Sequence, residues 1–204
     1  DEALAAATSA ALQQRGVANV RIITGDILKL LRFNLDNLRI SHGYNKVVAN
    51  IPYYLTGRLL RLIFESERLP RAIVLTIQKE VAERIVARPP HMNILALSVQ
   101  AFGKPEIIKI VPASCFSPKP GVDSAIIRIS DISNAFFQEN NLEKNEFFRI
   151  IRAAFGQKRK QLVNTVASIR GNKKEALEIL NASHINPKNR PEQLPLIQWA
   201  ALCH

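Results

Sequence analysis

Apolar and polar residues alternate along the chain with two different periods, which predict a succession of helices and short strands. Stretches in which apolar residues recur every three or four positions are typical of helices with one buried face. Short β-branched runs that end in polar or Pro-containing turns are typical of strands. The stretches predicted as strands are 20–23, 46–50, 72–77, 107–111 and 124–129. The stretches predicted as helices among them are 2–14, 57–65, 78–87 and 94–102.

The order of these elements predicts an α/β fold. Near-continuous apolar strands that alternate with helices are typical of a mainly parallel sheet covered by helices on both faces. Strands 107–111 and 124–129 have only a loop between them, so we expect an antiparallel pair at one edge. Ligands of such sheets bind outside the carboxyl ends of the strands, where Gly25-Asp26 and Asn50-Ile51-Pro52-Tyr53 fall.

The pattern changes after Asp131. An Asn-rich stretch over 134–145 is typical of a linker, and helical periodicity then continues to the end of the chain. The helices predicted there are 147–155, 160–170, 173–181 and 191–203. We therefore predict two domains, a sheet-containing domain over 1–134 and a helical domain over 135–204.

The composition is that of a globular protein with a strong excess of positive charge. Hydrophobic residues make up 47% of the 204 positions, and 28 Lys and Arg against 17 Asp and Glu give a net charge of +11. Such a surface attracts polyanions, among which nucleic acid is the foremost candidate. An anionic membrane surface is the weaker alternative, because membrane-bound helices favour Trp anchors and Trp199 is the only tryptophan.

The sequence also argues against several protein classes. No apolar run approaches the roughly 20 residues that span a bilayer, and the first residues resemble neither a signal sequence nor a transit peptide. Cys115 and Cys203 form no CxxC pair and the four His form no cluster, so neither a disulfide framework nor a metal ligand set is evident. We expect a soluble cytoplasmic protein that needs no metal.

The helical part contains a stretch with charges of one sign. Eight Lys and Arg and no acidic residue lie between Phe147 and Lys174, whereas solvated helix faces normally mix both signs. This stretch favours contacts with RNA phosphates, which give position and salt-dependent affinity. A soluble helical face that is merely basic is the alternative. The candidate RNA-binding residues are Arg149, Arg152, Lys158, Arg159 and Lys160.

The tetrapeptide Asn50-Ile51-Pro52-Tyr53 combines groups that suit an extruded adenine base. The exocyclic amine of adenine is a poor nucleophile, because its lone pair is delocalised into the ring. The Asn50 side-chain oxygen and the Pro52 carbonyl can accept the amine hydrogens and favour an attacking geometry, while Tyr53 stacks on the base. The alternative is an ordinary strand followed by a Pro turn with a half-buried Tyr.

An ordered series of motifs resembles the rRNA adenine N6-dimethyltransferases of the KsgA/RsmA family. Asn50-Ile51-Pro52-Tyr53 resembles the NLPY/NIPY motif of that family, and four further segments resemble family motifs in the same order. These segments are 78–85 (QKEVAERI), 97–100 (LSVQ), 111–125 (VPASCFSPKPGVDSA) and 153–164 (AAFGQKRKQLVN). With Thr24-Gly25-Asp26 they cover the chain from 24 to 164, and the ordered set is highly specific.

The resemblance implies a Rossmann-like domain that uses S-adenosylmethionine, followed by a small helical RNA-binding domain. The implied reaction is methyl transfer to the N6 amine of two adjacent adenosines in small-subunit rRNA. The resemblance implies that Asp26 and Asn50 bind the cofactor, that Asn50, Pro52 and Tyr53 hold the target base, and that Phe116 closes over the base opposite Tyr53. From the residues alone, Asp26 is equally well a cap at the end of a strand, and Phe116 is more often a core residue.

The chain departs from the family pattern in three respects. It contains no GxGxxG turn, and it begins just after the position at which the family holds the cofactor ribose. We therefore expect an amino-terminally truncated chain that binds S-adenosylmethionine poorly and is inactive by itself. In addition, Lys158 stands where the family has Arg, which keeps the charge but loses a planar bidentate donor.

Several other functions stay open on the sequence. The chain can be a non-catalytic RNA-binding factor of ribosome assembly, or a large-subunit rRNA adenine methyltransferase of the antibiotic-resistance type. DNA adenine methyltransferases share an Asn-Pro-Pro-Tyr motif but are not expected to share segment 153–164. For the favoured function, we expect the partner to be the pre-small-subunit ribosomal particle and the chain to be a monomer.

Overall fold

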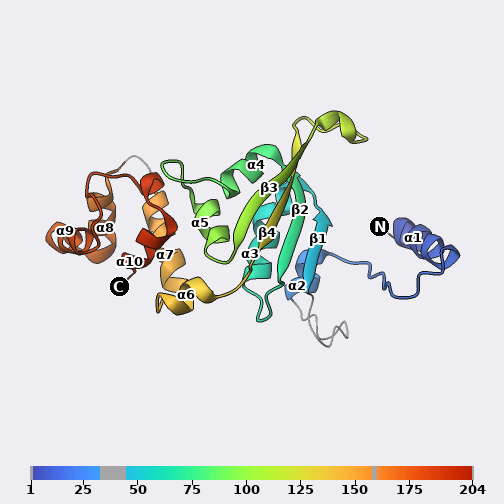
Figure 1. Ribbon diagram of the computed structural model, residues 1–204, viewed down its shortest axis with the longest axis horizontal. Helices are drawn as coiled ribbons and strands as arrows, with labels where there is room; N and C mark the ends of the chain where they lie inside the picture. The colour runs from blue at the N-terminus through green and yellow to red at the C-terminus, as the bar shows by residue number, and fades with distance from the viewer. Residues whose placement is uncertain (1, 33–44, 158–159, 204) are drawn as a thin grey trace.

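A computed structural model describes residues 2–32, 45–157 and 160–203, which form a four-stranded sheet with helices packed against it and a helical region beside them (Figure 1). The strands are β1 (Lys46–Asn50), β2 (Ala72–Gln78), β3 (Lys104–Val111) and β4 (Ser124–Ser130). Four of the five predicted strands therefore form, in the order β1-β2-β4-β3.

The pairing of the strands corrects one prediction. β1 and β2 are parallel, but β4 is antiparallel to both β2 and β3. The antiparallel pairing of β3 with β4 was expected, whereas the prediction of a mainly parallel sheet is wrong for the described residues. β4 inserts between β2 and β3, so the loop that precedes it brings residues 112–123 to the end of the sheet where β2 finishes.

One face of the sheet is much better covered than the other. Ile73, Leu75 and Ile77 of β2 are fully buried, as are their antiparallel partners on β4. The buried side chains of α3 (Thr56–Phe64), α4 (Lys79–Ile85) and α5 (Ile94–Gln100) join this face in one core. On the opposite face, Val48 of β1 is 76% exposed. The expected cover on both faces is therefore absent over β1 within the described part of the chain.

The remaining helices comprise α1 (Glu2–Gln14), α2 (Ile27–Arg32), α6 (Ala135–Glu139), α7 (Lys144–Phe155), α8 (Leu162–Arg170), α9 (Lys173–Ala182) and α10 (Leu196–Ala201). Helix α1 has the predicted bounds but buries none of its residues and lies apart from the sheet in Figure 1. Within the described ranges, none of the helices has the length and apolar character needed to cross a lipid bilayer.

Three predicted elements differ in the structure. Residues 20–23 form no strand, because a β-branched run needs a partner strand and Val20 is half exposed. The predicted linker over 134–145 contains α6, whose Phe137 is buried. The predicted helix 191–203 is divided into a 3₁₀ turn, η4 (Pro191–Gln193), and α10, because Pro195 cannot continue a helix.

An aromatic cluster joins the sheet region to the helical region. Phe102, which follows α5, stacks on Phe64 of α3 with ring centroids 4.6 Å apart. Phe102 also contacts Phe137 of α6 and Phe148 of α7, at 5.1 and 6.3 Å. The buried aromatic side chains therefore continue from one predicted domain into the other.

Candidate functional site

The segment Asn50–Tyr53 leaves the sheet at the carboxyl end of β1. Asn50 is the last residue of β1 and is exposed, whereas Ile51 is buried and anchors the segment in the core. Pro52 precedes the 3₁₀ turn η2 (Tyr53–Leu55), and its carbonyl accepts a hydrogen bond from the Leu55 amide at 2.9 Å. A carbonyl oxygen has two lone pairs, so Pro52, two residues after the exposed Asn50, keeps one acceptor position.

The Tyr53 ring is fixed by a hydrogen bond across the site. Its hydroxyl lies 2.8 Å from the hydroxyl of Ser124, the first residue of β4, which is fully buried. Thr56 closes the other end of the turn, because its hydroxyl donates to the Tyr53 carbonyl at 3.1 Å. Tyr53 is therefore held at both its ring and its backbone, and it follows the Asn50–Pro52 segment directly in the chain.

The loop that carries Phe116 is tied to the same place. A 3₁₀ turn, η3 (Ala113–Cys115), immediately precedes Phe116, and the Ala113 amide donates to the Asp123 carboxylate at 3.0 Å. The Asp123 carbonyl in turn accepts from the Lys79 amide at the start of α4, also at 3.0 Å. Asp123 and Ser124 are adjacent, so one dipeptide holds both the loop of Phe116 and the ring of Tyr53. Neither aromatic ring stacks on another ring among the described residues.

Asp26 caps α2. Its carboxylate Oδ1 accepts from the Leu28 amide at 2.9 Å, and its carbonyl accepts from the amides of Lys29 and Leu30. Leu28 packs into the core, and α2 contacts α3. Within the described ranges, no hydrogen bond joins Asp26 to the Asn50–Tyr53 segment, and the second carboxylate oxygen has no partner. Asp26 is thus a cap with one oxygen left to bind a ligand.

The predicted RNA-binding residues have different surroundings. Arg149 forms a bidentate pair with Glu146, with distances of 2.7 and 2.6 Å, and this hydrogen bonding lowers the pKa of Glu146. Arg152 is exposed and lies over the Phe148 ring at 5.9 Å. Lys160 is exposed, and Lys158 and Arg159 lie outside the described residues. Arg152 and Lys160 are therefore the two described candidates without an acidic partner.

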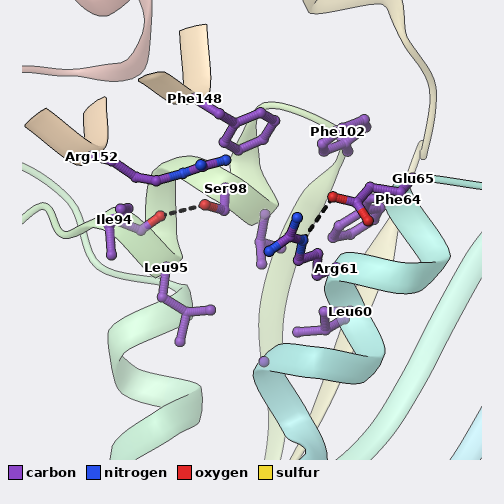
Figure 2. Close-up of a pocket in the computed structure, with 12 residues that line it drawn as sticks. Leu60, Arg61, Phe64, Glu65, Ile94, Leu95, Ser98, Phe102, Phe148 and Arg152 are labelled. Atoms are coloured by element: carbon purple, nitrogen blue, oxygen red, sulfur yellow. Dashed lines mark hydrogen bonds and ion pairs between the residues drawn. The ribbon is translucent and has the colours of Figure 1, made fainter. Parts of the chain in front are cut away.

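Two hollows adjoin each other between α3, α5 and the helical region, and neither is lined by Asn50, Tyr53 or Phe116. The smaller has a volume of about 240 Å³ and lies between α3, α5 and α7 (Figure 2). The larger, of about 740 Å³, is more polar and extends over α6. Sequence reasoning found neither hollow, because each depends on how helices distant in the chain pack together.

The two cysteines differ in exposure, since Cys115 is exposed and Cys203 is partly buried. Both are free, and burial raises the pKa of Cys203 to about 11, so its thiol is not ionised near neutral pH. The described residues contain no group of three or more His, Cys, Asp or Glu that could hold a metal ion. The groups described above at Asn50, Pro52 and Tyr53 are amide, carbonyl, hydroxyl and aromatic groups.

Comparison with known sequences gives consistent matches. A family model described as ribosomal RNA adenine dimethylase matches residues 1–203. The chain is similar to Ribosomal RNA small subunit methyltransferase A of Dehalococcoides mccartyi, with 39% identity over 186 residues, 91% of this chain and 62% of that protein. The protein of the same name from Moorella thermoacetica is 34% identical over 194 residues, 92% of this chain and 67% of that protein. The chain thus spans less than two thirds of the Dehalococcoides protein.

Solved structures show the same fold. A dimethyladenosine transferase from Plasmodium falciparum superposes with a TM-score of 0.82 at 22% identity, covering 99% of this chain and 78% of that chain. The 23S rRNA methyltransferase ErmE superposes with a TM-score of 0.69 at 18% identity, covering 100% of this chain and 78% of that chain. These likenesses confirm the predicted α/β, Rossmann-like architecture.

Proposed function

The chain belongs to the ribosomal RNA adenine dimethylase family, and on this premise we propose that it supplies the base-binding and RNA-binding parts of an S-adenosylmethionine-dependent methyltransferase. The proposed reaction is transfer of methyl groups to the N6 amine of adjacent adenosines in small-subunit rRNA. We prefer the small subunit because the relatives with 34% to 39% identity are named small-subunit methyltransferases. The pre-small-subunit particle is the proposed partner.

The observation that carries this proposal is the hydrogen bond that fixes Tyr53 beside Asn50 and Pro52. A base stacked on a ring that is already immobilised loses less entropy on binding and is held in one orientation. Its amine hydrogens then reach the Asn50 side-chain oxygen and the open lone pair of the Pro52 carbonyl. These acceptors favour a pyramidal nitrogen whose lone pair is directed away from the ring. Phe116, on the loop tied to Asp123, is proposed to close over the opposite face of the base.

The described residues fit part of the cofactor. When bound, S-adenosylmethionine supplies an electrophilic methyl group on a sulfonium centre. The free carboxylate oxygen of Asp26 suits the amine of the cofactor's adenine, and the exposed Asn50 amide lies at the end of β1 where both ligands are proposed to meet. Asp26 therefore has two proposed roles, as the cap of α2 and as a cofactor contact.

RNA binding is assigned to the helical region. We propose that residues 1–134 form the methyltransferase domain and residues 135–204 a helical domain that contacts RNA phosphates through Arg152, Lys160 and their basic neighbours. Phosphate contacts of this kind release counterions, so the affinity falls as salt rises, by roughly 0.7 to 0.9 in log K for each unit of log salt per contact. Arg149 is proposed to contribute less, because Glu146 already satisfies its guanidinium.

Fluorescence of 2-aminopurine tests the base-binding role. The probe replaces one of two adjacent adenosines in a hairpin from the 3′ end of small-subunit rRNA, and the chain is titrated into it. We expect a fluorescence change that Tyr53→Leu abolishes and that Tyr54→Leu, at a residue 85% exposed, leaves intact. Salt-sensitive binding without any Tyr53-dependent change would instead favour the non-catalytic RNA-binding factor.

A further inference from the structure

The cavity of about 240 Å³ between α3, α5 and α7 has walls that are almost entirely apolar. Phe64, Phe102 and Phe148 provide aromatic surface, and Leu60 and Leu95 provide aliphatic surface (Figure 2). The Ser98 hydroxyl also lines the cavity, but it donates its hydrogen to the Ile94 carbonyl at 2.6 Å. The cavity therefore suits an apolar group and offers almost no hydrogen bonds to a polar one.

The charged groups at the mouth of this cavity sum to one positive charge. Figure 2 shows Arg61 and Arg152 reaching toward the cavity from opposite walls, α3 and α7. Arg61 is neutralised by Glu65, with an Nε–Oε1 distance of 2.7 Å. Arg152 lies over the Phe148 ring and has no acidic partner among the described residues. Its guanidinium is always charged and presents a planar pair of donors that matches a carboxylate.

We propose that this cavity binds a small aromatic carboxylate, with the ring between the apolar walls and the carboxylate at the mouth on Arg152. An apolar cavity of roughly 150 Å³ holds benzene, so the larger volume found here suits a two-ring compound. A nucleobase fits less well, because its ring nitrogens and amine would lose their hydrogen bonds to water without replacement. The site does not include the residues proposed to bind the target adenine.

The ligand would contact the sheet region and the helical region at the same time. α3 and α5 belong to the core of the sheet, whereas α7 carries the first basic residues of the helical region. A compound bound among them stabilises the folded arrangement by mass action and raises the midpoint of thermal unfolding with its concentration. Its binding requires neither S-adenosylmethionine nor RNA, although Arg152 is also the residue proposed to contact RNA phosphates, so it can be tested whether or not the proposed methyl transfer holds.

Calorimetric titration with 2-naphthoate and with its neutral analogue 2-naphthalenemethanol tests the proposal. We expect 2-naphthoate to bind the wild-type chain. Arg152→Gln should weaken this binding about tenfold or more, since it removes a hydrogen bond between two charged groups. Arg152→Gln should leave the affinity for the neutral analogue unchanged. Arg58→Gln is the matched control, because it removes the same charge from α3 at an exposed residue that does not line the cavity.

A second variant locates the bound ring. Ser98→Leu places a larger apolar side chain in the cavity at the cost of one local hydrogen bond, and it should abolish binding of both compounds. Thermal unfolding of each variant shows whether it is still folded, and so separates loss of the binding site from loss of the fold. Absence of 2-naphthoate binding at millimolar concentration would overturn the proposal. Binding of 2-naphthoate that Ser98→Leu or Arg152→Gln leaves unchanged would overturn it equally.

Discussion

The Tyr53 hydroxyl lies 2.8 Å from the hydroxyl of Ser124, a residue 71 positions later in the chain. This hydrogen bond joins the segment after β1 to the start of β4. The preceding residue, Asp123, holds the η3 turn before Phe116. The two aromatic residues proposed to enclose the base are thus tied to one dipeptide, so their relative placement depends on Asp123 and Ser124 at the start of β4.

Tyr53→Phe tests the energetic role of this bond. The substitution keeps the ring but leaves the buried Ser124 hydroxyl without its partner, so we expect the free energy of unfolding to fall by about 1–2 kcal/mol. Urea denaturation measures the change. Tyr54→Phe is the matched control and should have no effect, because its side chain is 85% exposed. Equal stability of the Tyr53→Phe variant and the wild type would show that the hydroxyl pair does not fix the ring.

Two substitutions of Asp26 separate its proposed roles. Asp26→Ala removes the acceptor for the Leu28 amide and should cost about 1 kcal/mol of stability, as is typical of a lost helix cap. Asp26→Asn keeps a capping oxygen and should retain the stability, while it weakens any contact that needs a carboxylate acceptor. Urea denaturation tests the first effect. The second is tested by titrating S-adenosylmethionine into the chain joined to the part of the Dehalococcoides relative that it does not match. A stability loss of equal size in both variants would contradict the capping role of the side-chain oxygen.

The Glu146–Arg149 pair predicts a small pH dependence of stability. Hydrogen bonding from Arg149 lowers the pKa of Glu146 below its ordinary value of 4.5 in the folded state. The pair therefore stabilises the fold fully above pH 4.5, and this contribution is lost as the pH falls through the folded-state pKa. The effect is small, because both side chains are partly exposed. Wild type should unfold at a higher temperature than Glu146→Gln at pH 7, and the gap should narrow as the pH falls below 4.5.

An exposed carboxylate on another helix provides the control for that experiment. Glu178 of α9 has no acidic or basic partner among the described ion pairs and is exposed. The difference in unfolding temperature between wild type and Glu178→Gln should therefore not depend on pH in this way. A Glu146→Gln gap that stays constant from pH 7 to pH 3 would mean that the pair does not contribute through its charge.

Phe102→Ala tests whether the aromatic cluster couples the two regions. The side chain is buried and contacts Phe64, Phe137 and Phe148, so its truncation should cost about 3–5 kcal/mol. We expect urea unfolding of the variant to separate into two transitions, since the contacts between the sheet region and the helical region are lost first. A single transition with an unchanged midpoint would contradict this coupling.

Local patterns predicted most of the described elements. The strands and helices between 46 and 130 form close to their predicted bounds, because each has its own period and its own end signal. Residues 20–23 fail because strand formation depends on a neighbour that propensity cannot supply. Phe136 and Phe137 were overlooked in the Asn-rich stretch, although two adjacent aromatic residues are a signal for burial.

The candidate site was only partly predictable. Asn50, Pro52 and Tyr53 could be singled out because they are adjacent in the chain and chemically distinctive. Ser124 could be noticed as part of a motif, but its bond to Tyr53 depends on the insertion of β4 beside β2. Glu146, the partner of Arg149, lies one residue before the basic stretch in which Arg149 was singled out, so the ion pair was not predicted. The cavity between α3, α5 and α7 depends on tertiary packing alone.

Methyl transfer measured with a chimera tests the central proposal most directly. The chimera joins this chain to the part of the Dehalococcoides relative that it does not match, since the chain covers 62% of that protein. It is incubated with tritiated S-adenosylmethionine and small-subunit particles whose rRNA lacks dimethyladenosine. We predict label in N6-methylated adenosine, lost on Asn50→Ala and retained on Tyr54→Phe. A folded chimera that transfers no methyl groups, or whose activity survives Asn50→Ala, would contradict the proposed function.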